Sequence, residues 1–543
     1  MEKKGILEDH TFTGDHVPKL TKILFPWSGV FRDACYTLIG SYLMQYAINA
    51  GVLSTDPDVF QAQYGVITIA MIICLIWDGI NDPIMGFILE KAHFRSGKFR
   101  PWIEIGALGN SLCVALMFLI PYPQMGWGYV GFMIAMYVLW DLFFTMNDIG
   151  YWSMLPALTS DPKERASLTT QTTIAASVGT FLMSVLMVLL QGGRASMILV
   201  YRYAGLGVAL FFLLTQTVVF FLCKEKKRDP KQEEVSEHSS ILDLFRILGK
   251  NSQLRVCAIA LLLFYFSEFI LTGIGQNYFY MVFGYGSSKG GIVAVILSVI
   301  YVLGTMIAQA FYPLLIKKLS KQKILTLMVI VIVAAYVVFF FVGFPLFGEH
   351  PIAYNTVDSG NIGWAFGGTM FLYYLTAFLF FAATGVFYLA LMVMFQDAID
   401  YGEWKTGERK EAISFAWRPL DVKLASGLNR GLQWITYVSS GTLAFVNTIS
   451  NAEGTCNANA ATEGREAAEK IRDETIESAR GAIGQRNLVI MGVIIIGVIV
   501  ASSLASYFLL HFGFKIDEKK RDEINEELKK RHQADEEALK ARA

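Results

Sequence analysis

The sequence is poor in charged residues. Only 17% of its 543 residues are Asp, Glu, Lys or Arg, whereas soluble globular domains carry about 25%. The formal net charge is zero, so the sequence gives no electrostatic support to a nucleic-acid partner. The polar start MEKKGILEDHTFTGDH lacks the apolar core of a cleavable signal peptide. Apolar runs long enough to cross a bilayer, about 20 residues each, recur along the chain and predict a polytopic membrane protein.

Cysteine and histidine are also scarce. Five of the six cysteines lie in or at the edge of apolar segments, and only Cys456 lies in a long polar stretch. This spacing fits neither a disulfide framework nor a metal site. The seven histidines fall at termini, in loops or at helix ends, and no span contains HExxH or GxSxG. The sequence therefore disfavours an intramembrane enzyme.

We predict an all-α membrane protein with twelve spanning helices. They cover residues 30–51, 62–89, 102–121, 127–155, 168–191, 203–223, 254–283, 287–316, 323–345, 364–396, 413–449 and 486–512. Lys and Arg gather in alternate loops, at 91–100, 163–165, 317–323 and 405–410. Basic loops mark the cytoplasmic side, so we expect both termini to be cytoplasmic and the protein to be a multi-pass protein of the cell (inner) membrane.

The charged stretch KEKKRDPKQEEVSEHSS separates two sets of six spans. Six plus six spans about a cytoplasmic linker is the organisation of the major facilitator fold, with pseudo-symmetric halves. We expect an N-terminal bundle (1–223), a linker (224–253), a C-terminal bundle (254–512) with an outer insertion (450–485), and a cytoplasmic helical tail (513–543). Part of the insertion, AATEGREAAEKIRDETIESARGA, is predicted to form a short charged helix.

Two acidic residues stand in the second span, where WDGIND ends an apolar run. Asp78 and Asp82 are spaced i, i+4 and so share one helix face, with Asn81 beside them. Two carboxylates and an amide oxygen suit a small cation, and a like-charge pair also favours proton binding. The alternative is a structural salt bridge to Arg32 or Lys423. Glu268, in FYFSEFILTG, either serves transport or makes a hydrogen bond between helices.

The stretch WDGINDPIMGFILEKAHFRSGKFRPWI closely resembles the second-span signature of the glycoside–pentoside–hexuronide:cation symporters, the group of the melibiose permease. The resemblance recurs in the same order at FRDACYTLIGSYLMQY, TMNDIGYWSMLPALTSDPKERASL, MFQDAIDYGEWKTGER and DVKLASG. It covers nearly the whole chain. It implies a secondary active symporter with the major facilitator fold, a sugar or glycoside as passenger, and Na⁺ or H⁺ as the coupling ion with no further cofactor.

The resemblance also implies roles for individual residues. The positions that match the coupling-cation site are Asp78, Asn81, Asp82 and Thr145. Those that match or replace substrate-binding residues are Asp33 and Asp148 (sugar-hydroxyl acceptors), Trp152 (stacking on the sugar face), Tyr388 (a pocket aromatic) and Lys423 (a lysine close to the cation-site carboxylates). Carboxylates are strong acceptors for sugar hydroxyls.

One departure from the family pattern concerns an arginine among the sugar ligands. Its aligned position in the fifth span holds Thr173, while Arg418 appears in the eleventh span, where the family has a glutamine. An arginine fork suits a carboxylate, so Arg418 is a candidate substrate residue for an acidic sugar such as a glucuronide or hexuronide. The alternative is that Arg418 pairs with Asp421 or Asp148 and contacts no ligand.

Charged residues in two cytoplasmic loops are candidates for a conformational latch. They are Arg95, Lys98 and Arg100 in the first half and Asp397, Asp400, Glu403 and Arg409 in the second. Topology signals alone account for part of this charge. The expected partners are a small sugar or glycoside, a monovalent cation and the lipid bilayer, for a functional monomer. The alternatives are a lysolipid-type cation symporter, which would need an apolar cavity, and an intramembrane enzyme.

Overall fold

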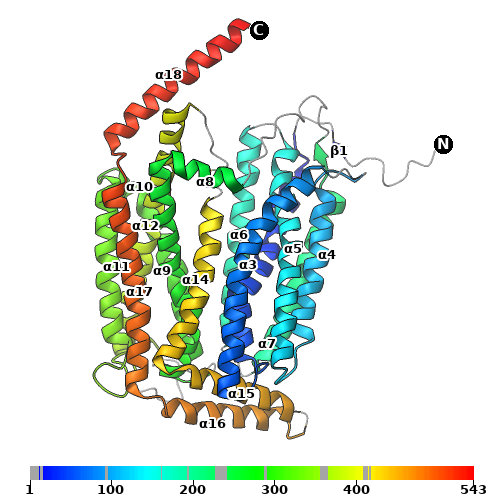
Figure 1. The fold of residues 1–543 in the computed structure, drawn as a ribbon, viewed down its shortest axis with the longest axis vertical. Coiled ribbons are helices and arrows are strands. Elements are labelled where there is room, and N and C mark those ends of the chain that lie inside the picture. Colours follow the sequence, from blue (N-terminus) through cyan, green and yellow to red (C-terminus); the bar gives the residue numbers. More distant parts are fainter. Residues whose placement is uncertain are drawn as a thin grey trace, which may run out of the picture. The chain divides into compact units, whose positions relative to one another are not determined.

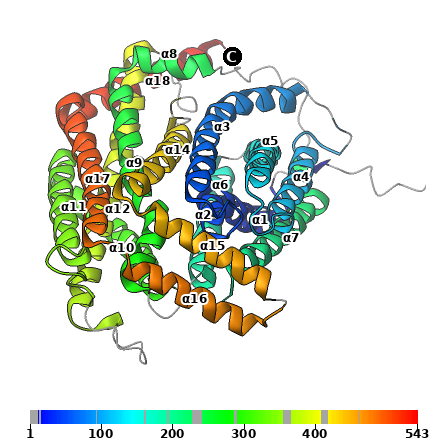
Figure 2. The same ribbon diagram turned by 60° about the horizontal axis from the view of Figure 1, so that its bottom comes forward.

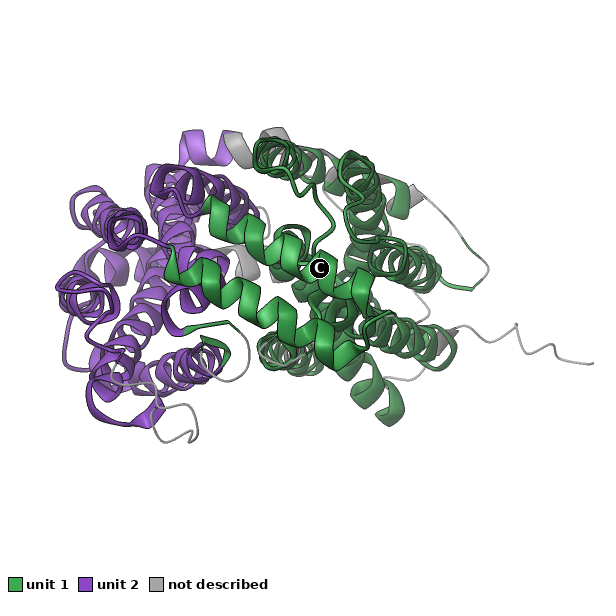
Figure 3. Cartoon of the chain, turned by 90° about the horizontal axis from the view of Figure 1, so that it is seen from below, with its two compact units in different colours: residues 1–237, 284–291, 443–482 green, residues 238–283, 292–442, 483–543 purple. Residues whose placement is uncertain are grey.

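The computed structural model describes residues 11–12, 16–91, 94, 96–159, 162–191, 195–226, 241–285, 290–354, 365–407, 414, 417–460 and 462–542. The chain divides into two compact units, which Figure 3 colours separately. Unit 1 comprises Met1–Glu237, Gly284–Gly291 and Leu443–Ala482. Unit 2 comprises His238–Phe283, Ile292–Thr442 and Ile483–Ala543. Two segments from the second half of the sequence therefore pack with the first half.

Long helices build unit 1, and their axes run roughly side by side in Figure 1. They are α1 (Lys19–Thr37), continued by the π-helix η1 (Leu38–Tyr42) and α2 (Leu43–Asn49), then α3 (Pro57–Lys91), α4 (Arg100–Leu119), α5 (Trp127–Leu158), α6 (Pro162–Gln191) and α7 (Met197–Leu222). Two short strands, β1 (Thr11–Phe12) and β2 (Glu225–Lys226), pair in parallel. The unit is completed by α15 (Leu443–Asn459) and α16 (Arg465–Gly481).

Unit 2 is also helical. It contains α8 (Ile241–Lys250), α9 (Ser252–Phe283), α10 (Gly290–Ile316), α11 (Lys321–Gly343), α12 (Gly368–Thr406), α14 (Trp417–Ser440), α17 (Gln485–Gly513) and α18 (Glu518–Arg542). The predicted all-α architecture is confirmed. The helix predicted for the tail after residue 513 is present as α18.

Ten helices in the described part of the chain are long and apolar enough to cross a membrane. The expected first and eleventh spans are not among them because they carry more charge. In α1 the charged residues are Lys19, Lys22, Arg32 and Asp33, and in α14 they are Arg418, Asp421, Lys423 and Arg430. With these two added, the helices agree with a fold of twelve spans.

The predicted end of the eleventh span at residue 449 is wrong. Helix α14 ends at Ser440, and the chain turns at Gly441, whose φ of +72° is readily adopted only by glycine. The apolar residues that follow belong to α15, which lies across the ends of the long helices rather than beside them (Figure 2). The helix predicted within the insertion is present as α16, with Ala468, Arg472 and Ile476 on its buried face.

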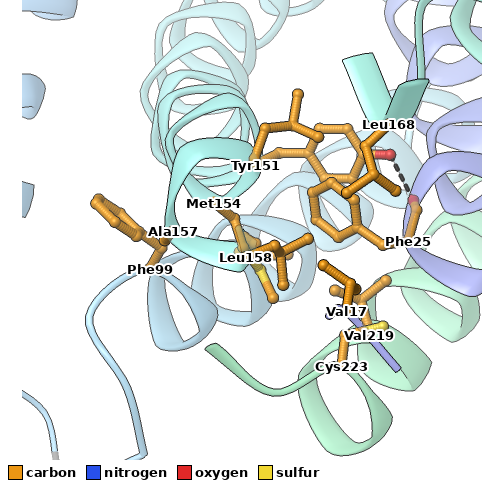
Figure 4. Packing of buried hydrophobic residues seen from close by; sticks show 12 residues of the cluster. Val17, Phe25, Phe99, Tyr151, Met154, Ala157, Leu158, Leu168, Val219 and Cys223 are labelled. Carbon is orange, nitrogen blue, oxygen red and sulfur yellow. Dashed lines mark hydrogen bonds between the residues drawn. The ribbon is translucent and has the colours of Figure 1, made fainter. Parts of the chain in front are cut away.

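A cluster of buried side chains joins α1 to α5 and to the helices around them (Figure 4). The rings of Phe25 and Tyr151 stack with centroids 4.5 Å apart. The Tyr151 hydroxyl donates a hydrogen bond of 2.6 Å to the Phe25 carbonyl, the dashed line in Figure 4. Ring stacking and a buried hydrogen bond together fix α1 against α5. This matters because Asp33 and Asp148, two of the predicted substrate residues, lie on these two helices.

Helices α1 and α6 approach each other closely at Gly179. A Cβ atom at this position would lie 2.0 Å from the Val30 carbonyl oxygen, which is far inside van der Waals contact. Small residues allow membrane helices to pack this tightly. Gly207 on α7 is different, since a Cβ atom there would meet nothing within 4 Å.

We expect Gly179→Ala to destabilise the protein by about 1–3 kcal/mol, because the methyl group forces α1 and α6 apart. Gly207→Ala is the matched control and should leave stability unchanged or slightly raised. The measurement is thermal unfolding of the purified protein in detergent. Equal melting temperatures for the two variants would contradict the close packing.

The inserted helix pair, α15 and α16, is anchored to unit 1 by a buried carboxylate. Glu453 is fully buried, and its Oε1 lies 3.2 Å from Nη1 of Arg472, itself 2% exposed. The Tyr285 hydroxyl donates to the same oxygen over 2.5 Å, and the Met197 N–H donates to Oε2 over 2.9 Å. The Glu453 carboxylate is therefore contacted by donor groups from three segments: α16, the loop between α9 and α10, and the start of α7.

Close backbone contact adds to this anchor. A Cβ atom on Gly51 would lie 2.3 Å from the backbone nitrogen of Gly454, and Gly51 has φ +74°. The amide of Asn451 donates to the Thr55 carbonyl over 3.1 Å. The loop that joins α2 to α3 and the helix α15 are thus packed backbone to backbone.

We expect Arg472→Met to detach α16, since removing one partner of a buried ion pair costs about 3–5 kcal/mol. Lys470→Met is the control, because Lys470 is 76% exposed and its pairing with Glu474 is a surface contact. Limited proteolysis of the folded protein should cut within residues 460–484 of the Arg472 variant only. Equal protection of both variants would count against the anchor.

Candidate functional site

The carboxylate pair predicted from the sequence lies on α3 in unit 1. Asp78 and Asn81 are buried and Asp82 is half-buried. The hydroxyl of Thr145, on α5, donates to Oδ1 of Asp82 over 3.2 Å. The structure therefore brings the predicted hydroxyl to the predicted carboxylate from two different helices.

Several oxygen atoms at this place could hold a cation. Two carboxylates, the Thr145 hydroxyl and the side-chain carbonyl of Asn81 are hard ligands of the kind that small cations prefer. The Asn81 amide nitrogen is buried and has no hydrogen-bond partner among the described residues. Arg32, one of the two salt-bridge partners considered above, pairs elsewhere in the described part of the chain. Its ion pairs there are with Asp33 and Asp148.

Arg32 instead joins the two predicted sugar acceptors. Its Nη2 donates to Oδ2 of Asp33 over 2.9 Å, and its Nη1 lies 3.0 Å from Oδ1 of Asp148. The contact with Asp148 is ionic, because Nη1 has no hydrogen bond of acceptable geometry to any described residue. The guanidinium is 2% exposed, whereas the side chains of Asp33 and Asp148 are 19% and 39% exposed. The acceptors are thus open to a ligand, while the cation behind them is buried.

Aromatic rings surround this arginine. Its guanidinium carbon lies 4.4 Å from the ring centroid of Tyr151 and 5.3 Å from that of Trp152. The Trp152 indole N–H donates to Oδ1 of Asp148 over 3.1 Å. Cation–π contact, the Arg32–Asp148 ion pair and the charged hydrogen bond from Trp152 hold Arg32, Asp148 and Trp152 as one group.

Helix α5 connects this group to the carboxylate pair. Thr145, Asp148 and Trp152 follow one another at i, i+3 and i+7, so they share one face of α5. Thr145 contacts Asp82 of the predicted cation site, and one turn later Asp148 contacts Arg32. A movement of α5 that changes one contact therefore changes the other.

Unit 2 contains the remaining predicted substrate residues, on α12 and α14. The Tyr265 hydroxyl, from α9, donates to the Tyr388 hydroxyl over 3.2 Å, and Nε of Arg418 donates to Tyr265 over 3.5 Å. Lys423 is half-buried on the same helix as Arg418. Arg418, Tyr265 and Tyr388 form one polar cluster.

Arg418 does not pair with Asp421 in the described part of the chain. Asp421 is 2% exposed, and its Oδ2 is buried without a hydrogen-bond partner among the described residues. The partners of Arg418 there are uncharged hydroxyls. Thr173, which stands where the family has an arginine, donates to the Thr169 carbonyl of its own helix over 3.0 Å and is exposed.

Of the predicted latch residues of the first half, Lys98 lies just before α4 and Arg100 is the first residue of that helix. The side chain of Arg100 donates to the carbonyls of Ser96 and Phe220. The Glu225 carboxylate accepts hydrogen bonds from the backbone N–H groups of Lys98, Phe99 and Arg100. An anion at a helix N-terminus is favourable, so Glu225 ties the end of α7 to the start of α4. Arg95 lies outside the described residues.

In the second half, the predicted latch residues lie at the end of α12. Asp397 forms a buried ion pair with Lys321 at the start of α11. Glu403 is buried and Asp400 half-buried on the same helix end. Arg409 lies outside the described residues.

A further acidic anchor holds the start of α6. Lys22 lies 2.6 Å from Oε1 of Glu164, and the Thr159 hydroxyl donates to Oε2 over 2.7 Å. Burial would raise the pKa of Glu164, but these donors and the Val17 N–H hold that pKa below its ordinary value. The group is therefore ionised at neutral pH.

Three contributors were not assigned to the site from the sequence. Arg32 stood out as an intramembrane charge next to Asp33, but nothing in the sequence tied it to Asp148, which is 116 residues away in the numbering. Tyr265 has no signal of its own among the many aromatics. Lys321 counted only as a charge of a cytoplasmic loop, although it pairs with Asp397.

Comparison with known protein families shows which family this chain belongs to. A family model described as MFS/sugar transport protein matches residues 57–518. The chain belongs to this family. The resemblance to the glycoside–pentoside–hexuronide:cation symporters is thereby confirmed, and so is the major facilitator fold.

Individual relatives of this sugar transport family member are distant. It is 24% identical to the raffinose carrier protein of Pediococcus pentosaceus over 429 residues, which cover 77% of this chain and 62% of the carrier. The chain thus spans about three-fifths of that carrier's length. It is 28% identical to the putative glycoside/cation symporter YagG of Escherichia coli over 204 residues, covering 37% of this chain and 43% of YagG.

A solved structure shows the same fold. The bacterial homologue of the human lysosomal transporter Spinster, in an inward-facing and unoccupied conformation, has a TM-score of 0.56 and 13% sequence identity. The match covers 90% of this chain and 97% of that one.

We expect acid to loosen the start of α6 in this family member. A carboxylate with a lowered pKa stabilises the fold above its ordinary pKa, and this contribution disappears as the pH falls through the lowered value. Lowering the pH from 7 to about 4 should therefore reduce the melting temperature of the wild type more than that of Glu164→Gln. Glu466→Gln, which changes an exposed glutamate in the first turn of α16, should behave like the wild type.

Proposed function

We propose that this chain is a secondary active symporter, which carries a sugar or glycoside together with a monovalent cation by alternating access. The proposal includes a location in the cell membrane with both termini cytoplasmic, as the distribution of basic loops indicates. The names of the raffinose carrier and of the putative glycoside/cation symporter agree with this passenger and this coupling. Transport, rather than chemical conversion, is the activity.

One observation carries the proposal. Helix α5 presents Thr145 to the carboxylate pair and, one turn further, Asp148 to Arg32 and Trp152. This supports a cation site and a polar, aromatic-lined acceptor site that share one face of one helix. Sugars need this second kind of surface, because hydroxyl groups require acceptors and the faces of the ring require apolar contact.

Coupling follows from the charge of the carboxylates. A cation bound to Asp78 and Asp82 neutralises part of their charge and draws Thr145 into its coordination. This fixes α5 and the position of Asp148, which favours sugar binding. Linkage requires that the sugar raise cation affinity by the same factor, typically 5- to 150-fold. Without the cation, the negative charge of Asp78 and Asp82 in the membrane disfavours reorientation.

An acidic passenger is the narrower form of the proposal. Arg418 hydrogen-bonds to Tyr265, and within the described residues its charge meets no carboxylate. A guanidinium whose partners are neutral hydroxyls can receive the carboxylate of a glucuronide or hexuronide. The charged groups around Asp33 and Asp148 argue against the lysolipid alternative, which needs an apolar cavity.

The coupling is tested by Asp82→Asn. We expect this variant to lose roughly 5- to 150-fold of the cation stimulation of sugar uptake, the usual range for coupled sites. Asp58→Asn changes an exposed aspartate in the first turn of the same helix and should retain the stimulation. The measurement is uptake into vesicles of neutral and acidic glycosides, with and without a sodium or proton gradient. Full cation stimulation in Asp82→Asn would place coupling elsewhere.

The acidic passenger is tested by Arg418→Gln. Uptake of an acidic glycoside should fall about tenfold or more, since a charged hydrogen bond contributes about 1.5–3 kcal/mol, while uptake of a neutral glycoside changes little. An equal loss for both passengers would remove the acidic-sugar proposal and leave the symporter proposal standing.

A further inference from the structure

A second polar site lies inside unit 2, beside the Arg418 cluster. The ring of Phe264, which lines this site, has its centroid 5.6 Å from that of Tyr388 and 5.7 Å from that of Tyr265. A small cavity is lined by side chains of α9, α11, α12 and α17, which are neighbours in Figures 1 and 2. Its polar lining consists of Ser267, Glu268, Tyr336, Thr384 and Ser503. The cavity volume is about 20 Å³, which is room for about one water molecule or one small cation.

Glu268 is the charged group of this cavity. It lies near the middle of α9, an apolar helix long enough to span the membrane. The Tyr301 hydroxyl, from α10, donates to its Oε1 over 2.8 Å, so the hydrogen bond between helices expected from the sequence is present. Among the described residues this is the one hydrogen bond that Glu268 makes, and it uses one of two carboxylate oxygens.

No positive side chain faces Glu268 from the described lining. The titratable groups around it are Tyr301 on α10 and Tyr336 on α11, and α12 and α17 contribute Thr384 and Ser503. A single hydroxyl donor does not offset the cost of an ionised carboxylate in a membrane helix, which amounts to several kcal/mol. The carboxylate needs one positive charge.

Besides Glu268 the lining holds four hydroxyl groups among apolar side chains, and two of these hydroxyls favour a positive occupant over a hydrogen-bond acceptor. The Ser267 hydroxyl donates to the Phe264 carbonyl over 2.7 Å, and the Thr384 hydroxyl donates to the Phe380 carbonyl over 2.7 Å. Since these hydroxyl hydrogens are already used, the same oxygens have only lone pairs left to offer. Lone pairs and a carboxylate beside a space for one particle describe a site for a small cation.

We propose that Glu268 and this cavity form a second monovalent-cation site, occupied by a sodium ion or by a proton carried on the carboxyl group. The two occupants share one chemistry, the delivery of a single positive charge to Glu268. The site is separate from Asp78 and Asp82, which belong to unit 1. It goes beyond the proposed function, and its existence does not require that the chain transport a sugar.

The test measures binding rather than transport. The full-length protein in lipid nanodiscs is titrated with radioactive ²²Na⁺ to saturation, and the bound ions per chain are counted for the wild type and Glu268→Gln. Infrared spectra across a pH series record the C=O stretch of protonated carboxyl groups in the same samples. Glu104→Gln is the control for the sodium count. Glu104 also accepts a hydrogen bond from a hydroxyl group, that of Thr217 over 2.8 Å, but it does not line the cavity.

The results distinguish a sodium site, a proton site and the absence of a site at Glu268. A sodium site predicts one bound ion fewer per chain in Glu268→Gln and no change in Glu104→Gln. A proton site predicts an unchanged sodium count and the loss of a carboxylic-acid band in Glu268→Gln. If the variant neither loses an ion nor loses a band, the proposal is overturned. Glu268→Asp keeps the charge. Weaker sodium binding or a shifted carboxylic-acid band in this variant therefore reports on the site even where Glu268→Gln does not fold.

Because the count separates the two sites, failure of one does not hide the other. Asp82→Asn removes the predicted site of unit 1 and should leave the Glu268-dependent ion or band in place. A loss of both signals in Asp82→Asn would contradict a separate site in unit 2.

Discussion

A carboxylate inside a membrane protein needs a positive partner, and the arrangement of unit 1 follows from this requirement. Arg32 supplies the partner for Asp33 and Asp148, and stacking of Phe25 on Tyr151 holds α1 where the arginine can reach both. The guanidinium pairs with these two acids on α1 and α5, whereas Asp78 and Asp82 lie on α3. Arg32 and the cation site that we propose therefore meet α5 at successive turns.

In the function that we propose, this arrangement lets one helix couple the binding of two ligands. Thr145 and Asp148 are one turn apart on α5, so a rigid helix cannot move one without the other. Coupling through α5 needs no chain of small side-chain shifts. The contacts that change when α5 moves are those of Thr145 to α3 and of Asp148 to α1. The physical basis of the proposed coupling is thus a shared rigid element that both ligands would bias, rather than nearness alone.

Local patterns in the sequence predicted the parts of this protein whose cause is local. Apolar runs gave the spans, and the i, i+4 spacing gave the shared face of Asp78 and Asp82. The pairing of Arg32 with Asp148 could not be predicted, because it depends on how α1 and α5 pack. The end of α14 was missed for a similar reason: the run after Gly441 stays apolar, and only the left-handed turn there separates one helix from the next. The Glu268 cavity likewise arises from four helices whose packing no local pattern records.

The inserted helix pair has a consequence for biosynthesis. Unit 1 contains residues 443–482, so its buried Glu453 and Arg472 are translated long after the six long helices they pack with. Domains commonly fold in the order in which the ribosome delivers them. Here unit 1 stays incomplete until about nine-tenths of the chain has been made. Until then, the helix ends near Gly51 and Met197 are not covered by α15 and α16. Truncated chains that stop before residue 443 would leave these ends open to quality-control proteases and chaperones.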